Sequence, residues 1–233
     1  MSQPTPIVLI TGASRGIGAE LVHYFLKNSE LRIVAVSRSI KEYGDLPEEY
    51  HHRFKVYQAD ISLSSEVNRL ADAISKLGMV SYIINNAGLL INKPFTLFTD
   101  EEFQQMFGVN FFGPAMLIRE LLPFLARPAH IVNITSMGGY QGSAKFPGLS
   151  MYSASKGALN ILSECLAEEF KTDHIYVNAL ALGAVQTEML EEAFPGYKAP
   201  VSAAEMAAFI ADFTQNGYRL MNGKVLPVSL NTP

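Results

Sequence analysis

Tyr152 and Lys156 stand four residues apart in the stretch MYSASKGALNIL, and their side chains could carry out proton transfer. The stretch predicts a helix, because Ala, Leu and Lys dominate it and no proline interrupts it. Residues four apart share one helix face, so the phenol and the ammonium group would point into the same space. A nearby cation favours the phenolate, so we expect the Tyr152 pKa to fall from about 10 toward neutrality, where the phenol can exchange a proton with a carbonyl or an alcohol. Taken alone, such a pair is more often two residues of an ordinary helix.

A glycine-rich turn near the N-terminus could bind a phosphate group. The apolar run at 7–10 predicts a buried strand, TGASRGIG follows at 11–18, and a helical stretch comes next. Glycines let the backbone approach an anion, and the free N–H groups at a helix N-terminus point toward it. The spacing of Gly12, Gly16 and Gly18 differs from both G-x-G-x-x-G and the P-loop. Its place between a first strand and a first helix favours a dinucleotide site over a simple connection.

The rest of the chain alternates strand-like and helix-like stretches. The expected strands cover 7–10, 31–36, 54–58, 80–84, 130–135, 175–181 and 224–230. The expected helices cover about 17–28, 64–77, 100–126, 152–171 and 202–215. This alternation predicts an α/β fold, in which one doubly wound parallel sheet of about seven strands carries helices on both faces. Pro227 inside the last strand predicts that this strand lies at a sheet edge.

Composition and charge disfavour several other classes of protein. The chain has 233 residues, of which 48% are apolar and 17% charged, as suits a well-buried domain rather than a disordered chain. The net charge of −4 and the lack of a basic cluster disfavour nucleic acid as a partner, and no apolar run is long enough to span a membrane. The single Cys165 suits a reducing cytoplasm, and its Leu and Ala neighbours predict a buried side chain. The histidines form no spaced cluster with cysteines or carboxylates, so we expect no metal.

Further motifs accompany the glycine-rich turn and the Tyr–Lys pair. In chain order the set comprises TGASRGIG, NNAG at 85–88, Asn110, Ser136 and Tyr152-x-x-x-Lys156. In kind, order and spacing this set resembles the short-chain dehydrogenase/reductase family, from about residue 5 to about residue 228. The resemblance implies a single Rossmann-type NAD(P)-binding domain over residues 1–233, with a substrate lid at about 188–201.

The resemblance also implies catalytic roles. Ser136, at the carboxyl end of the fifth expected strand, would hydrogen-bond a substrate carbonyl, and Tyr152 would act as acid or base. Lys156 would lower the Tyr152 pKa and hold the nicotinamide ribose, and Asn110 would anchor a proton-relay water. Thr135 is the alternative to Ser136, although adjacent strand residues face opposite ways.

The end of the second expected strand indicates which nicotinamide cofactor binds. An acid there would bind the adenosine ribose, whereas an arginine accommodates a 2′-phosphate. The chain has Arg38 and no acid at this point, and Arg15 lies in the glycine-rich turn, so NADP(H) is favoured over NAD(H) unless both arginines are merely solvated. Asn86 could equally tie strands together. By resemblance, the other cofactor-binding residues are Gly12, Ser14, Gly16, Ile17, Gly18, Asp60, Ile61, Asn86, Ala87, Gly88, Tyr152, Lys156, Gly183, Val185 and Thr187.

Departures from the family pattern concern the pocket. Leu182-Gly183 replaces the usual Pro-Gly, the loop between Ser136 and Tyr152 is longer than usual, and the closing Asp-Gly-Gly is replaced by Ser229-Leu230-Asn231. The segment after the sixth strand would form either an apolar lid or merely a packed turn, with Met189, Leu190, Phe194 and Tyr197 as its apolar residues.

These observations favour a cytoplasmic NADP(H)-dependent reductase or dehydrogenase. It would act on a carbonyl or secondary alcohol of a small, partly apolar substrate, with a 3-oxoacyl thioester as the leading example by resemblance. The alternative is a non-catalytic NADP(H)-binding regulator or scaffold, which the complete Tyr–Lys set counts against. A nucleotide-sugar epimerase fits poorly, because little chain remains for a substrate domain. The helices at 100–126 and 152–171 are apolar on more than one face, which predicts a homodimer or homotetramer.

Overall fold

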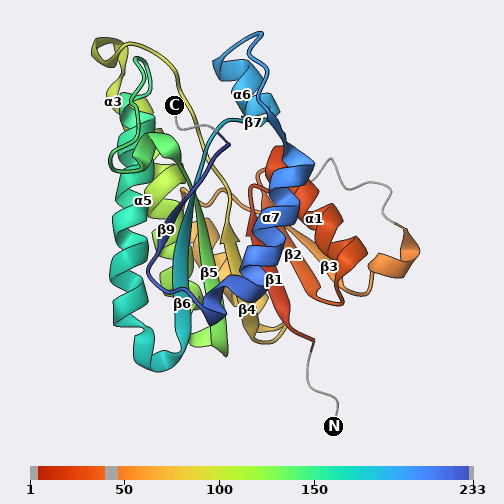
Figure 1. Ribbon diagram of the computed structural model, residues 1–233. Helices are drawn as coiled ribbons and strands as arrows, with labels where there is room; N and C mark the ends of the chain where they lie inside the picture. Colours follow the sequence, from red (N-terminus) through yellow and green to blue (C-terminus); the bar gives the residue numbers. More distant parts are fainter. Residues whose placement is uncertain (1–4, 40–46, 231–233) are drawn as a thin grey trace.

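The computed structural model describes residues 5–39 and 47–230, and it contains a seven-stranded parallel sheet with helices on both faces (Figure 1). Residues 1–4, and Asn231 of the altered tail, lie outside the described part. The sheet strands are β1 Ile7–Thr11, β2 Arg32–Ser37, β3 Phe54–Gln58, β4 Val80–Asn85, β5 Leu125–Ser136, β6 Ile175–Leu182 and β9 Val225–Val228. A separate parallel pair consists of β7 Val185–Gln186 and β8 Val201–Ser202. The expected α/β sheet is therefore confirmed.

The strand order is β3-β2-β1-β4-β5-β6-β9. The chain winds outward from β1 in one direction through β2 and β3, and then returns to start the other half at β4. Neighbouring parallel strands whose connections leave in opposite directions open a crevice at their carboxyl ends. The topology therefore places a binding crevice between β1 and β4. Strand β9 lies at the sheet edge, as Pro227 predicted.

Helices cover the two faces unequally. The α-helices are α1 Gly16–Asn28, α2 Ser64–Ser75, α3 Asp100–Phe107, α4 Gly113–Leu121, α5 Ser150–Glu169, α6 Glu188–Ala193 and α7 Ala203–Asn216. Helices α1 and α7 pack together on one face, whereas α2, α4 and α5 cover the other (Figure 1). In the described part of the chain, no helix combines the length and the apolar character needed to cross a lipid bilayer.

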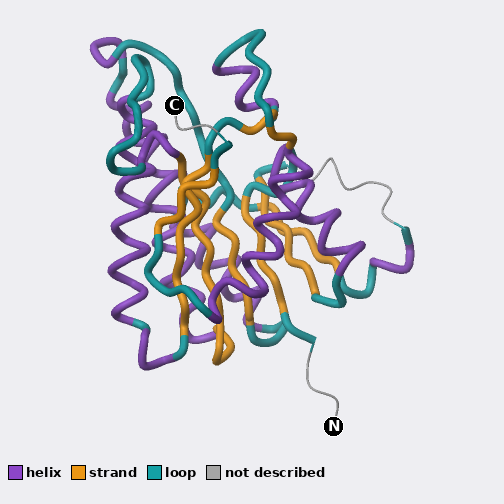
Figure 2. Tube along the Cα trace, viewed as in Figure 1, coloured by secondary structure: helices purple, strands orange, loops and turns teal. Residues whose placement is uncertain are grey.

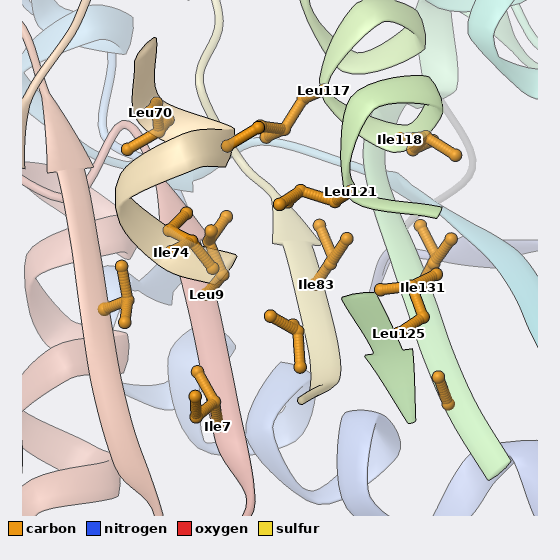
Figure 3. Close-up of a cluster of buried hydrophobic side chains, with 14 of the residues drawn as sticks. Ile7, Leu9, Leu70, Ile74, Ile83, Leu117, Ile118, Leu121, Leu125 and Ile131 are labelled. Carbon is orange, nitrogen blue, oxygen red and sulfur yellow. The ribbon is translucent and has the colours of Figure 1, made fainter. Parts of the chain in front are cut away.

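Strand β1 shows why both faces must be covered. Ile7 and Leu9 belong to the core under α2 and α4, where Figure 3 shows them beside Ile83. Val8 and Ile10 alternate with them and enter the second core, under α1 and α7. Because successive strand residues face opposite ways, a run that is apolar throughout is stable only when both faces are buried.

The expected continuous helix at 100–126 is wrong. Helix α3 ends at Phe107, a π-helical turn occupies Gly108–Phe112, and α4 follows as a separate segment. Pro114 explains part of the break, because it has no N–H for the carbonyl four residues earlier. Strand β5 then begins at Leu125, five residues before the predicted start, whereas the other expected elements end within one or two residues of their predicted limits.

Cys165 also differs from its prediction, because its side chain is exposed. The buried positions of α5 include Leu159, Ser163 and Ala167, which follow the helical spacing of one face. Cys165 lies between them in sequence and therefore points away from the sheet. The apolar neighbours in the sequence did not reveal which side of the helix it occupies.

A buried histidine lies far below the crevice, where β5 meets α7. The ring of His130 is fully buried, and its Nδ1 lies 2.9 Å from the Thr214 carbonyl, to which it must donate. Its Nε2 lies 3.0 Å from the Asn178 amide nitrogen. That amide also donates to the Met221 carbonyl, while Asn178 Oδ1 accepts from the Lys224 N–H. The orientation of Asn178 is thus fixed, and Nε2 must accept, so the folded protein requires neutral His130.

Acid should destabilise the fold through His130. Burial lowers the pKa of His130 from 6.5 to about 4. Between these two pH values, His130 is protonated in the unfolded chain and neutral in the folded chain. The contribution of neutral His130 to the free energy of unfolding is complete above pH 6.5 and is lost as pH falls toward 4. The loss between pH 7.5 and pH 5 is about 2 kcal/mol. Urea unfolding at these two pH values should show a smaller pH effect for His130→Gln than for the wild type. His23→Gln, at an exposed position, should keep the wild-type slope, and an unchanged slope in His130→Gln would contradict this account.

Candidate active site

A cleft of about 800 Å³ opens at the carboxyl ends of the strands, on the crevice between β1 and β4. Figure 2 shows the loops that gather at this end of the sheet. The structure brings together in this cleft nearly all the predicted site residues. These are Gly12, Ser14, Arg15, Gly16, Ile17, Arg38, Asp60, Ile61, Asn86, Ala87, Gly88, Ser136, Tyr152, Lys156, Gly183, Val185 and Thr187. Gly18 and Asn110 do not line it.

The glycine-rich turn fits against the end of β4. Gly12 has a φ of +64°, and a Cβ at this position would lie 2.6 Å from the Ala87 Cα atom. Thr11 Oγ1 accepts the N–H groups of Asn86 and Ala87, at 3.1 and 3.0 Å. The Asn86 amide donates in return to the Thr11 and Gly12 carbonyls, at 3.0 and 3.1 Å. Asn86 therefore ties the two strand ends together.

Gly18 acts through packing rather than by lining the cleft. A Cβ there would lie 2.1 Å from the Gly12 carbonyl oxygen and 2.6 Å from Asn86 Nδ2, so only glycine lets α1 start so close to the turn. Helix α1 begins without a side-chain cap and without an acid in its first turn. Its first N–H groups and the positive end of its dipole are therefore directed at the cleft. This arrangement suits an anion such as a phosphate.

Ser136 and Tyr152 meet at the floor of the cleft. Ser136 ends β5 and accepts the Gly138 N–H at 3.2 Å, and its hydroxyl lowers the pKa of Tyr152. Thr135 instead directs its hydroxyl to the Leu180 carbonyl, at 3.3 Å. The Thr135 hydroxyl is thus engaged with the backbone, and Ser136 remains the predicted residue of the two.

Burial dominates the electrostatics of the Tyr–Lys pair. Lys156 is 3% exposed, and its Nζ donates to the Ile134 carbonyl at 2.9 Å. Burial lowers the pKa of Lys156 to about 8. Burial also raises the pKa of Tyr152, and the hydrogen bond with Ser136 only partly opposes this effect. The predicted fall in the Tyr152 pKa is therefore wrong, because the Lys156 Nζ is held 6.0 Å from the centre of the phenol ring and desolvation outweighs it.

Asn110 braces the wall of the cleft from behind. It is fully buried in the π-helical turn, and its amide accepts the Leu89 N–H and donates to the Leu89 carbonyl, both at 2.8 Å. The same amide donates to Ser155 Oγ at 2.9 Å, and Ser155 in turn donates to the Tyr152 carbonyl. The side chain thus fixes the loop after β4 against the first turns of α5. Since Pro114 cannot donate to it, the Asn110 carbonyl lacks its usual helical partner.

Helix α6 lies in the segment expected to form a lid over the cleft. Thr187 caps α6 by accepting the Leu190 N–H at 3.3 Å, and Asn92 holds the other end by donating to the Ala193 carbonyl at 3.0 Å. All four apolar residues named for this segment line the cleft, namely Met189, Leu190, Phe194 and Tyr197. These side chains lie where an apolar lid would need them, and the lid itself stays a prediction.

An ion pair joins the lid to the glycine-rich turn. Arg15 Nη1 lies 2.5 Å from Glu192 Oε1, and Nη2 lies 3.3 Å from Oε2. The hydrogen bonds and charge of Arg15 lower the pKa of the Glu192 carboxyl, which keeps it ionised. In the described residues, no group of three or more His, Cys, Asp or Glu could hold a metal ion.

The altered tail supplies cleft residues that the sequence did not identify. Ser229 and Leu230 line the cleft, and a Cβ on Gly183 would lie 2.4 Å from Ser229 Oγ. Leu182 extends β6 by pairing with both Ser136 and Val228. The sequence marked Leu182, Ser229 and Leu230 only as departures from the family pattern. Nothing in these residue types indicates contact with a ligand.

Comparison with known proteins agrees with this geometry. A sequence model of the short chain dehydrogenase family matches residues 6–198. A benzil reductase ((S)-benzoin forming) of Saccharomyces cerevisiae is 31% identical over 194 residues, which cover 80% of this chain and 74% of that protein. The 3-ketoacyl-(acyl-carrier-protein) reductase from Brucella melitensis, solved with NADH, superposes with a TM-score of 0.84, 27% identity and 96% of each chain covered. The structure of ElxO with NADP bound gives a TM-score of 0.83, 26% identity and 97% of each chain covered.

Proposed function

The chain belongs to the short-chain dehydrogenase family of oxidoreductases, and we propose that it is an NADP(H)-dependent reductase of small, partly apolar carbonyl compounds. The observation that carries this proposal is that Ser136, Tyr152 and the buried Lys156 line one cleft together with apolar residues of the lid. These groups can bind a carbonyl oxygen and protonate it.

The cleft has the features that a nicotinamide dinucleotide phosphate needs. Gly12 lets the glycine-rich turn lie directly against Ala87, and the uncapped N-terminus of α1 offers N–H groups to a pyrophosphate. Arg15 and Arg38 line the same cleft, and β2 ends without an acid that would repel a 2′-phosphate. Charge-assisted contacts of this kind favour NADP(H) over NAD(H).

The chain's own residues would direct the chemistry. When bound, the cofactor would supply a hydride to the carbonyl carbon. Ser136 would donate a hydrogen bond to the carbonyl oxygen, and Tyr152 would give it a proton. Because burial raises the pKa of Tyr152, the phenol stays protonated near neutral pH, which suits reduction. Lys156 would hold the cofactor ribose, and the Asn110 carbonyl is the group that would bind a relay water.

The lid indicates the size and polarity of the substrate. The segment from Glu188 to Val201 is short, and its apolar side chains line a cleft that must hold both cofactor and substrate. A compact compound with a hydrophobic portion fits such a site. A short 3-oxoacyl thioester and a diketone such as benzil both meet this description, and the names of two similar proteins support these two examples.

We also propose self-association through the outer face of α5 and the π-helical turn. Phe112 and Ile161 are each more than half exposed there, and Cys165 is exposed beside them on α5. Apolar side chains gathered on one helical face indicate a surface that a second copy could cover.

Light scattering at micromolar concentration should show a dimer or a tetramer. Ile161→Glu should shift the protein toward monomer, because the new carboxylate would be buried without a partner in the interface. Leu220→Glu, at an exposed position on another element, is the control and should leave the assembly unchanged. A wild type that is entirely monomeric would refute the assembly.

Arg38→Ala should weaken NADPH binding by roughly ten- to a hundredfold and leave NADH binding nearly unchanged, because only NADPH carries the 2′-phosphate. Fluorescence titration of both cofactors checks this. Arg69→Ala removes the same charge from an exposed site on α2 and serves as the control. Equal affinity of the wild type for the two cofactors would refute the NADP(H) preference.

Tyr152→Phe should lower turnover of benzil or a short 3-oxoacyl thioester by about a hundredfold or more, because it removes the proton donor, while NADPH binding stays intact. Lys156→Ala should impair both turnover and NADPH binding. Tyr176→Phe, on β6 and outside the cleft, is the control. Wild-type turnover in Tyr152→Phe would show that another group is the acid.

A further inference from the structure

The lid places a cluster of negative charge over the glycine-rich turn. Helix α6 carries Glu188, Glu191 and Glu192 and no basic residue. A Cβ on Gly16 would lie 3.4 Å from Glu188 Oε2, so this carboxylate lies close to the start of α1. The uncapped N-terminus of α1 favours a negative charge here, whether from a carboxylate or from an anionic ligand. The lid thus brings its own anions to a site suited to phosphate.

The lid carboxylates make different contacts. Glu191 Oε1 accepts the Gly196 N–H at 2.9 Å, within the turn that follows α6. Glu192 instead reaches across the cleft rim to Arg15, which is 177 positions away in the chain. Its two oxygens face the two terminal nitrogens of the guanidinium group, at 2.5 and 3.3 Å. Glu192 therefore occupies the fork that makes arginine suited to planar or phosphate anions.

Arg15 cannot offer this fork to two anions at once. It lines the cofactor cleft, and its side chain remains 46% exposed, so an incoming phosphate can reach it. We propose that Glu192 competes with the 2′-phosphate of the cofactor for Arg15 and thereby sets how strongly the protein prefers NADPH over NADH. The inference rests on the proposed use of NADP(H). It makes Glu192 a specificity-determining residue that acts from the lid.

Loss of the ion pair between Arg15 and Glu192 should not displace the lid. Thr187 caps one end of α6, and Asn92 holds the other end through the Ala193 carbonyl. Both residues of the pair are substantially exposed, so neither is part of the core. A glutamine at position 192 would keep the shape of the side chain and remove its charge. The variant therefore tests the competition rather than the folding of the lid.

The test is a titration of NADPH and of NADH into the wild type, Glu192→Gln and Glu191→Gln at low ionic strength. An exposed ion pair changes affinity by up to about fivefold. Glu192→Gln should therefore tighten NADPH binding between about twofold and fivefold more than NADH binding. Glu191→Gln removes the same charge from the same helix, where the carboxylate accepts the Gly196 N–H within the following turn, so it should change both affinities equally.

Each result decides the inference. The inference is overturned if the ratio of NADPH affinity to NADH affinity is unchanged or lower in Glu192→Gln than in the wild type. It is also overturned if this ratio rises equally in Glu191→Gln. A wild type that binds both cofactors equally, together with a Glu192→Gln variant that favours NADPH, would refute the proposed preference but support the competition. Equal binding in the wild type and in Glu192→Gln would overturn both.

Discussion

The site depends on the tie between the ends of β1 and β4. Thr11 and Asn86 exchange hydrogen bonds across the point where the two halves of the sheet diverge. This tie fixes the glycine-rich turn so closely that Gly12 and Ala87 leave no space for a further Cβ. The crevice, the exposed start of α1 and the adjacent arginines all follow from that arrangement. An anionic cofactor is therefore positioned by backbone geometry first and by charged side chains second.

Desolvation is the second constraint, and it acts on the reacting groups. Burial alone destabilises the cation of Lys156 and the phenolate of Tyr152. Lys156 is retained in this costly place with a backbone carbonyl as its partner. Such an arrangement contributes little to stability, which is why we attribute it to function. The Asn110 and Ser155 contacts behind the cleft hold the helix that carries both groups.

Sequence alone predicted the sheet and most element limits, because motifs and periodicity are local properties, and nearly all of its predicted site residues line the cleft. Prediction from the sequence failed for features that depend on contacts between residues far apart in the chain. The spacing of Tyr152 and Lys156 indicated proximity but not burial, so the direction of the Tyr152 pKa was wrong. The helix expected at 100–126 took no account of Pro114, and the structure shows a π-helical turn just before it. The pairing of Arg15 with Glu192 has no sequence signal at all.

The central claim is that this cleft performs hydride transfer rather than only binding a cofactor. The most direct measurement supplies NADPH deuterated at the transferable position, with benzil in one reaction and a short 3-oxoacyl thioester in another. Mass spectrometry then locates the deuterium. We predict an alcohol product with deuterium on the carbinol carbon in at least one reaction. Tight NADPH binding without deuterium transfer to either compound would contradict the account and favour a non-catalytic NADP(H)-binding protein.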